Sequence, residues 1–153
     1  MDHTIKTEKA PNPVGSYPHA RKVGNLLFLS GVGPRKPGTN VIPGVMMDGQ
    51  GNALCHDIEV QCHSVFENVK IILEEAGSTW SNLIDITVFL TNMSRDFDTF
   101  NKIYGEYFMD NQPCRTTVEV TSLPTPIAIE LKCIATIEPV SYTHLRAHET
   151  LSY

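Results

Sequence analysis

Arg115 and Glu130 are the two residues whose types and spacing suggest chemistry, because both fall inside predicted β-strands near the end of the chain. The segment PCRTTVEVTSLPTPIAIELKCIA is typical of two strands joined by a proline-containing turn. Strands of a small protein usually carry apolar residues at such positions, so an arginine and a glutamate need a reason. A guanidinium can bind a carboxylate through two parallel hydrogen bonds, and a glutamate can move a proton or hold a water.

The alternation of a strand places Arg115, Thr117 and Glu119 on one face, while Glu130 lies opposite the apolar series of its own strand. If the two strands pair as an antiparallel hairpin that turns near Ser122, Arg115 lies roughly opposite Glu130. One interpretation is an exposed cross-strand ion pair, worth at most about 1 kcal/mol. The other is a site that binds and activates an acidic substrate. The residues alone leave both interpretations open.

The rest of the chain predicts the elements that would position these side chains. Apolar runs bounded by glycine predict strands, and apolar residues at spacings of three and four predict helices. Asp57 can cap the first helix at its start, and Gly77 can end it. In chain order the expected elements are a strand at 23–31, a helix at 57–78, a strand at 83–91, a helix at 95–109, and strands at 115–121 and 127–137.

The predicted fold class is α+β, a sheet of four to six strands with two helices packed on one face. Residues 32–56 are rich in glycine and proline, which predicts a long loop that is either a functional lid or a solvent-exposed segment. The strand at 83–91 carries apolar residues on both of its faces. Because two helices cover only one face of the sheet, the other face is expected to meet another subunit.

Composition limits the class of protein and of partner. The chain has 153 residues, 41% hydrophobic and 19% charged, and a net charge of -5, which argues against nucleic-acid binding. No apolar run is long enough to span a membrane and no secretory signal is visible, so a cytoplasmic location is expected. We expect one domain, residues 1–139. Residues 140–153 lack apolar periodicity and resemble translated adapter sequence, so they are expected to be a non-native, disordered tail.

A metal site is the alternative that the cysteines raise. The segment CHDIEVQCH brings four potential zinc ligands close together in sequence: Cys55, His56, Cys62 and His63. A structural zinc needs four ligands that converge, yet Cys62 falls on the apolar stripe of the predicted helix and His63 points to a different side. We therefore expect free thiols, no metal and no cofactor.

Three long segments carry a resemblance to a known family: APNPVGSYPHARKVGNLLFLSG, TVFLTNMSRDFDTFNKIYGEYF and the strand pair that contains Arg115 and Glu130. They resemble the RidA/YjgF family of enamine/imine deaminases, and the likeness runs from about residue 4 to residue 138. Within this family the sequence is most similar to the 2-aminomuconate deaminases. The resemblance implies a chorismate-mutase-like mixed β-sheet with two helices on one face. It also implies a homotrimer with the sheets facing inward and sites between subunits.

The resemblance also assigns residues. The family's arginine for the substrate carboxylate falls on Arg115, and its water-handling glutamate falls on Glu130. Tyr17 and Ser30 match positions that would supply hydrogen bonds around the cleft. One departure is Thr117, which stands where many members have cysteine, so the implied chemistry has to work without a nucleophilic thiol.

The implied function is hydrolytic deamination of 2-aminomuconate in aromatic-compound catabolism, without a cofactor. Two alternatives remain, namely a general deaminase of small imino acids such as 2-iminopropionate, and a family member that binds a ligand without catalysis. A dicarboxylate needs a second cation, because a buried charge is costly unless it is paired. Arg35 is the first candidate, ahead of His19 and Lys36, and the alternative for Arg35 is an ordinary solvated loop charge.

Overall fold

A six-stranded mixed sheet forms the centre of the computed structural model, which describes residues 3–139. The predicted tail, 140–153, lies outside the described residues. All neighbouring strands are antiparallel except β6 and β7, which are parallel. Across the sheet the strands are β1 (Thr4–Ile5), β2 (Ala20–Val23), β3 (Leu26–Leu29), β8 (Ile129–Thr136), β6 (Leu83–Leu90) and β7 (Cys114–Glu119).

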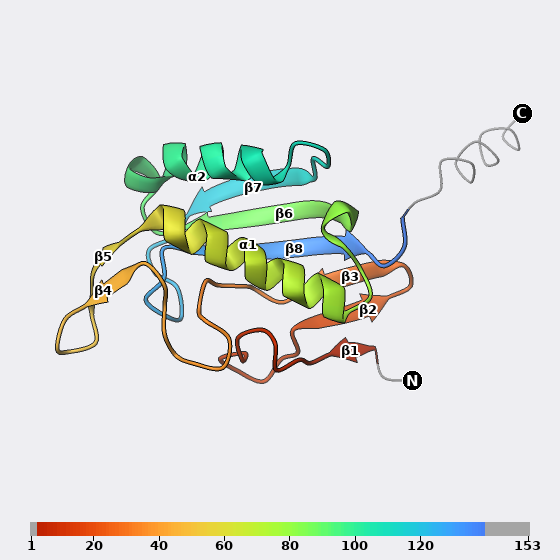
Figure 1. The fold of residues 1–153 in the computed structure, drawn as a ribbon, viewed down its shortest axis with the longest axis horizontal. Coiled ribbons are helices and arrows are strands. Elements are labelled where there is room, and N and C mark those ends of the chain that lie inside the picture. Colours follow the sequence, from red (N-terminus) through yellow and green to blue (C-terminus); the bar gives the residue numbers. More distant parts are fainter. Residues whose placement is uncertain (1–2, 140–153) are drawn as a thin grey trace, which may run out of the picture.

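Both helices, α1 (Ile58–Glu75) and α2 (Met93–Tyr107), lie against the same face of the sheet (Figure 1). The predicted α+β class with two helices on one face is therefore confirmed. The core lies between these two layers, and its largest fully buried side chains include Phe66, Phe100 and Leu131. No helix among residues 3–139 combines the length and the apolar character that crossing a bilayer requires.

The first helix begins and ends where the sequence predicts. The Asp57 side chain accepts a hydrogen bond of 3.2 Å from the backbone N–H of Val60, which satisfies a free donor of the first turn. At the other end Gly77 has a φ of +81°, a left-handed conformation that glycine adopts without steric cost. The buried side chains of α1 follow the predicted apolar stripe.

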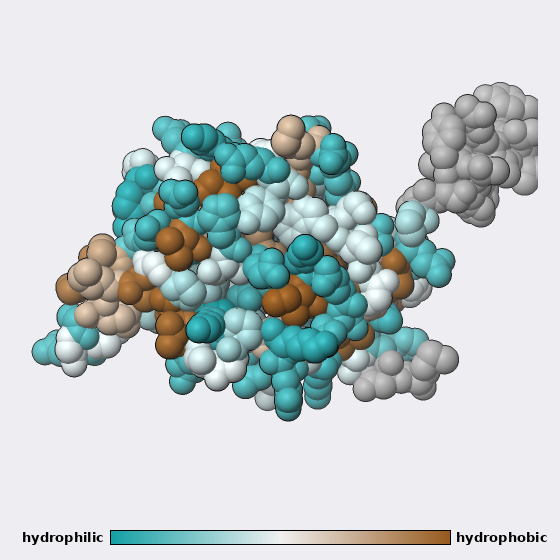
Figure 2. All heavy atoms as spheres, in the orientation of Figure 1, coloured by the Kyte–Doolittle hydropathy of each residue, from teal (hydrophilic) through white to brown (hydrophobic). Residues whose placement is uncertain are grey.

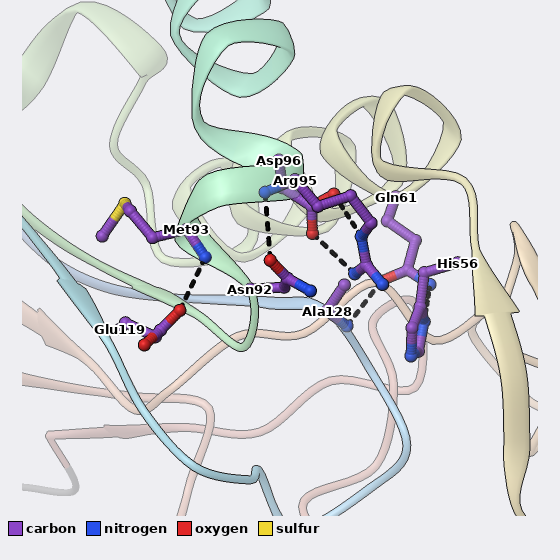
Figure 3. Close-up of polar contacts among 8 residues, drawn as sticks. All are labelled: His56, Gln61, Asn92, Met93, Arg95, Asp96, Glu119 and Ala128. Atoms are coloured by element: carbon purple, nitrogen blue, oxygen red, sulfur yellow. Dashed lines mark hydrogen bonds and ion pairs between the residues drawn. The ribbon is translucent and has the colours of Figure 1, made fainter.

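The second helix begins two residues before the predicted start, because Asn92 caps it. The Asn92 side chain accepts a 3.0 Å hydrogen bond from the N–H of Arg95. Glu119, at the end of β7, accepts a 2.8 Å hydrogen bond from the N–H of Met93 (Figure 3). Both contacts place oxygen at the positive end of the helix dipole. The second of them also ties α2 to the strand that carries Arg115.

Two buried amides on α1, which sequence analysis passed over, hold the loops next to the sheet. Gln61 contacts Nδ1 of His56 at 3.0 Å and accepts a 2.8 Å hydrogen bond from the N–H of Ala128 (Figure 3). Asn68 donates to the carbonyls of Gly33 and Arg35, each at 2.9 Å. The two amides are seven residues apart, two helical turns, so they share the buried face with the apolar stripe. That spacing is the signal that could have revealed them.

The segment predicted as one long loop contains a β-hairpin, β4 (Val45–Met47) paired with β5 (Ala53–His56). The hairpin projects beyond the end of the sheet (Figure 1). Its turn is the sequence DGQG, residues 48–51, where the Asp48 carboxylate accepts hydrogen bonds from the N–H groups of Gln50 and Asn52 at 2.8 and 2.9 Å. Met46 and Leu54 are exposed on it, which is unusual for residues this apolar.

The predicted hairpin between the last two long strands is wrong, because β6 lies between β7 and β8. A strand followed by a helix and a second strand favours parallel neighbours, and β6, α2 and β7 form such a unit. The connection from β7 then crosses the end of β6. There Val120 donates to the carbonyl of Leu90 at 2.9 Å, and Thr91 donates to the carbonyl of Ala128 at 3.1 Å.

Candidate active site

Arg115 projects from the edge strand β7 toward the helices. It is paired in register with Ile86, whose side chain is fully buried under the helices, so the two share a face. Its Nη1 donates a 2.9 Å hydrogen bond to Oδ1 of Asn101. The guanidinium carbon lies 4.6 Å from the centre of the Tyr104 ring and 5.3 Å from that of Phe100. Helix α2 therefore holds a planar cation whose other N–H groups are available to a carboxylate.

Two buried hydroxyls lie on the same side of the sheet as Arg115. The Oγ1 of Thr117 and the hydroxyl of Tyr104 are buried without a hydrogen-bond partner among the described residues. Burial raises the pKa of Tyr104 to about 12, so this hydroxyl keeps its proton. Cys114 is exposed and alternates to the other face of β7, so its thiol does not substitute at the position of Thr117.

Glu130 points to the opposite face of the sheet. Its neighbours in β8, Ile129 and Leu131, are fully buried on the helix side, and Glu130 itself is paired in register with Phe89. The carboxyl group is half-buried and has no hydrogen-bond partner among residues 3–139, and burial raises its pKa. Gly31 leaves room for it, because a Cβ at that position would lie 2.9 Å from Oε2 of Glu130.

One cavity, of about 50 Å³, brings five of the seven predicted site residues together. It lies between the N-terminal segment 11–19, the start of the long loop at 30–35 and the segment 124–130. The predicted residues in its wall are Tyr17, His19, Ser30, Arg35 and Glu130. Arg115 and Thr117 do not line it.

Two hydroxyl residues of the cavity wall, Ser30 and Tyr17, each form a hydrogen bond with the nearby backbone. Ser30 donates a 2.7 Å hydrogen bond to the carbonyl of Pro18, so its oxygen can still accept one from a ligand. The Tyr17 hydroxyl accepts a 3.2 Å hydrogen bond from the N–H of Val14, so its own proton remains available for donation. The pair thus offers the cavity one acceptor and one donor.

His19 is a structural member of the wall. Its Nδ1 accepts a hydrogen bond of 3.3 Å from the N–H of Thr7, so Nε2 carries the proton, and this nitrogen lies 2.8 Å from the carbonyl of Pro11. Both ring nitrogens are therefore engaged by the backbone of the N-terminal segment. In this arrangement His19 orders the wall and does not serve as the second cation that a dicarboxylate needs.

Arg35 is the cation of the cavity wall, since the other charged member is Glu130. Its side chain is half-buried, and Nη2 donates to the carbonyl of Asn12. Its backbone is fixed by Asn68 on α1, as described above. Lys36, the remaining candidate, is exposed and lies outside the cavity wall. Of the three candidates, Arg35 is thus the one in the cavity wall whose side chain is always charged.

The described residues do not assemble the metal site that the cysteine and histidine spacing raised. Within residues 3–139 no group of three or more histidine, cysteine, aspartate or glutamate side chains converges as metal ligands would. Cys62 is buried in the core, and burial raises the pKa of its thiol to about 12. His56 contacts Gln61 instead. The chain's free cysteines are Cys55, Cys62, Cys114 and Cys133.

Comparison with known proteins extends these observations along nearly the whole described chain. Residues 7–137 match the family model described as Endoribonuclease L-PSP. A RutC family protein of Pyrococcus abyssi is 41% identical over 131 residues, which cover 86% of this chain and 94% of that protein. The chloroplastic Reactive Intermediate Deaminase A of Arabidopsis thaliana is 37% identical over 133 residues, which cover 87% of this chain and 65% of that protein.

Solved structures agree in fold as well as in sequence. RidA from the Antarctic bacterium Psychrobacter sp. PAMC 21119 superposes with a TM-score of 0.75 at 33% identity, covering 88% of this chain and 98% of its own. TdcF of E. coli, solved with bound serine, gives a TM-score of 0.74 at 32% identity and covers 87% and 97%. The fold, the matched length and these identities show that the chain belongs to the RidA/YjgF family.

Proposed function

We propose that this protein hydrolyses enamines and imines of 2-amino acids to 2-oxo acids and ammonia. The observation that carries the proposal is Glu130, a half-buried carboxyl group with a raised pKa and no hydrogen-bond partner within residues 3–139, in the wall of a small cavity beside Tyr17 and Ser30. A structural carboxylate would have a hydrogen-bond or ion-pair partner, whereas a group that exchanges protons with a substrate is left free to do so. The relative named Reactive Intermediate Deaminase A supports the same class of reaction.

The reaction has two steps. A 2-aminoalkenoate gains a proton at C3 and loses one from nitrogen, which gives the 2-imino acid. Water then adds to the C2 carbon of the imine, a proton moves to nitrogen, and ammonia leaves as the carbonyl forms. Glu130 would take a proton from the attacking water and return one to the leaving nitrogen. Its raised pKa brings it closer to neutral pH, where both transfers are efficient.

Arg115 would bind the C1 carboxylate of the substrate and so orient the imine carbon. Its guanidinium is already stacked on α2, which lowers the entropy lost on binding. Tyr17 and Ser30 would hydrogen-bond to the water and to the leaving nitrogen. Thr117 has no nucleophilic role in this reaction, because imines hydrolyse by direct attack of water.

The complete site would lie between two subunits. Arg115 and Glu130 point to opposite faces of one chain's sheet, so a second copy has to bring its own Arg115 to the cavity that holds Glu130. The face that carries Glu130 has no helix over it among the described residues, and apolar side chains are exposed there, among them Val23 and Ile84. A homotrimer with the sheets facing inward would bury this face.

The proposed substrate is 2-aminomuconate, which has a carboxylate at each end. With one carboxylate on Arg115, the other requires a cation, and Arg35 is the cation in the cavity wall. The decisive measurement is the release of ammonia by the purified protein from 2-aminomuconate and, separately, from 2-iminopropionate. Turnover of both would support the general activity, and a strong preference for the first would support the dicarboxylate. If ammonia is released from both compounds no faster with the protein than without it, the proposed function is contradicted.

A further inference from the structure

A second hollow adjoins the candidate cavity and has a different chemical character. It is an open groove of about 480 Å³ beneath the β4–β5 hairpin. Val14, Arg35 and Thr125 line both the groove and the cavity, so the two lie side by side at these three residues. Beyond this junction the groove is walled mainly by Val41, Ile42, Val45 and Met47. Figure 2 shows apolar side chains gathered over this hairpin.

The size of the cavity makes the groove relevant to substrate choice. A volume of about 50 Å³ corresponds to roughly three to five water molecules, at about 10–15 Å³ each. It can hold an imino group and the attacking water, but the carbon chain of any substrate larger than 2-iminopropionate has to extend out of it. One exit leads along the N-terminal segment past Lys6 and Glu8, which carry charges of both signs. The other exit is the apolar groove.

We propose that the groove is a subsite for the side chain of substrates that lack a second carboxylate, and that it takes an uncharged, branched or unsaturated chain of about four or more carbons. The inference rests on the proposed deaminase function. A short chain that ends in a carboxylate would stop at Arg35, whereas a longer apolar chain continues along the wall. Val14 and Val41 are 53% and 58% exposed, so a bound chain would remove apolar surface on both partners from water.

The groove wall and the hairpin provide a matched pair of variants to test this subsite. Val41→Asp places a carboxylate in the groove wall, just before the hairpin, and Leu54→Asp places one on the hairpin at a position that does not line the groove. Both side chains are exposed, so neither change disturbs the core. Lys6→Ala tests the other exit from the cavity.

Calorimetric titration of the assembled protein with two stable 2-oxo acids, pyruvate and 4-methyl-2-oxopentanoate, measures the subsite without requiring turnover. The wild type is expected to bind the branched acid about tenfold or more tightly than pyruvate, the discrimination typical of added methylenes in an apolar pocket. Val41→Asp should remove this preference and leave pyruvate binding unchanged, while Leu54→Asp and Lys6→Ala should preserve it. Equal affinities of the wild type for the two acids would overturn the subsite. A selective loss of affinity for the branched acid in Leu54→Asp or Lys6→Ala would overturn it as well.

Turnover separates this inference from the function on which it rests. Imino acids formed from leucine and from alanine by an amino acid oxidase provide the two substrates. If the oxo acids bind with the expected preference and neither imino acid is hydrolysed faster than in buffer, the deaminase proposal fails while the subsite stands. If both are hydrolysed with equal KM and the oxo acids bind equally, the deaminase proposal stands and the subsite fails.

Discussion

Arg115 and Glu130 lie on opposite faces of one β-sheet, with β6 between the strands that carry them. Arg115 is stacked on α2, and Glu130 lines a cavity formed with the N-terminal segment. An ion pair within one chain, the simple explanation for these two residues, is therefore excluded by the order of the strands. Each side chain instead remains open to a ligand, and a site that uses both groups would need Arg115 and Glu130 from different copies of the chain.

Subunit complementation is the first prediction. Arg115→Ala and Glu130→Gln should each lose most of their activity alone, but a mixture that is unfolded and refolded together should regain part of it. If each interface takes Arg115 from one chain and Glu130 from its neighbour, about a quarter of the interfaces in an equal mixture are intact. Ammonia release measures the recovery, and light scattering should give the mass of a trimer. A well-folded monomer, or a refolded mixture as inactive as its parents, would refute the shared site.

Substitution of Arg115 tests the carboxylate contact. Arg115→Ala should lower kcat/KM roughly a hundredfold, the effect of losing charge-assisted hydrogen bonds of about 1.5–3 kcal/mol. Arg115→Lys should restore little of the lost activity, because lysine lacks the planar guanidinium that binds a carboxylate through two hydrogen bonds and stacks on Tyr104. Steady-state kinetics on 2-iminopropionate measure both variants, with circular dichroism as the control for folding. Activity of the alanine variant close to that of the wild type would remove Arg115 from the site.

Glu130→Gln should lose activity and gain stability at neutral pH. Burial raises the pKa of Glu130, so between the unfolded and the folded pKa the native state binds more protons, and stability falls as pH rises through this window. Glutamine carries no such penalty. Urea unfolding at pH of about 3.5 and about 7.5 should show the variant's greater stability only at the higher pH.

The pH dependence of activity should also report on Glu130. In the wild type, kcat/KM should rise with pH through a pKa above the ordinary glutamate value of about 4.3, and Glu130→Gln should lack this rise.

Tyr104 is predicted to position Arg115 through its ring and not through its hydroxyl. Tyr104→Phe keeps the face on which the guanidinium is stacked and removes a buried hydroxyl that has no partner among the described residues. Its activity should therefore be close to that of the wild type. Tyr104→Leu removes the cation–π contact, worth about 0.5–2 kcal/mol, and should raise KM roughly three- to thirtyfold. A marked loss of activity in Tyr104→Phe would instead assign the role to the hydroxyl.

Local patterns predicted the elements well because local interactions determine them. The Asp57 cap and the left-handed Gly77 place the ends of α1, and the apolar stripe identifies its buried face. Strand pairing is not local. Residues 113–135 match the pattern of a hairpin, yet the crossover through α2 makes β7 parallel to β6, and β8 pairs on the other side. Sequence alternation gave the correct face for Arg115 and for Glu130 within each strand, but not the strand that lies between them.

The candidate site was predictable where a resemblance supplied the positions, and less so where tertiary contacts decide a role. Nothing in the sequence shows that both nitrogens of His19 are engaged by the backbone, or that Asn68 fixes the loop that carries Arg35. Both roles depend on contacts between residues eight or more positions apart. The β4–β5 hairpin was hidden for a similar reason, since its strands are too short for alternation to be visible.

The last prediction concerns the far end of a dicarboxylate. Arg35→Ala should raise KM for 2-aminomuconate roughly ten- to a hundredfold, the loss expected for one charge-assisted hydrogen bond of about 1.5–3 kcal/mol. It should barely affect 2-iminopropionate, which has no second carboxylate. Lys36→Ala is the matched control, because this neighbouring cation lies outside the cavity wall. Equal losses on both substrates would mean that Arg35 acts through its contact with Asn12 and supports the wall. No loss on either substrate would remove the cation from the site and, with it, the structural argument for a dicarboxylate.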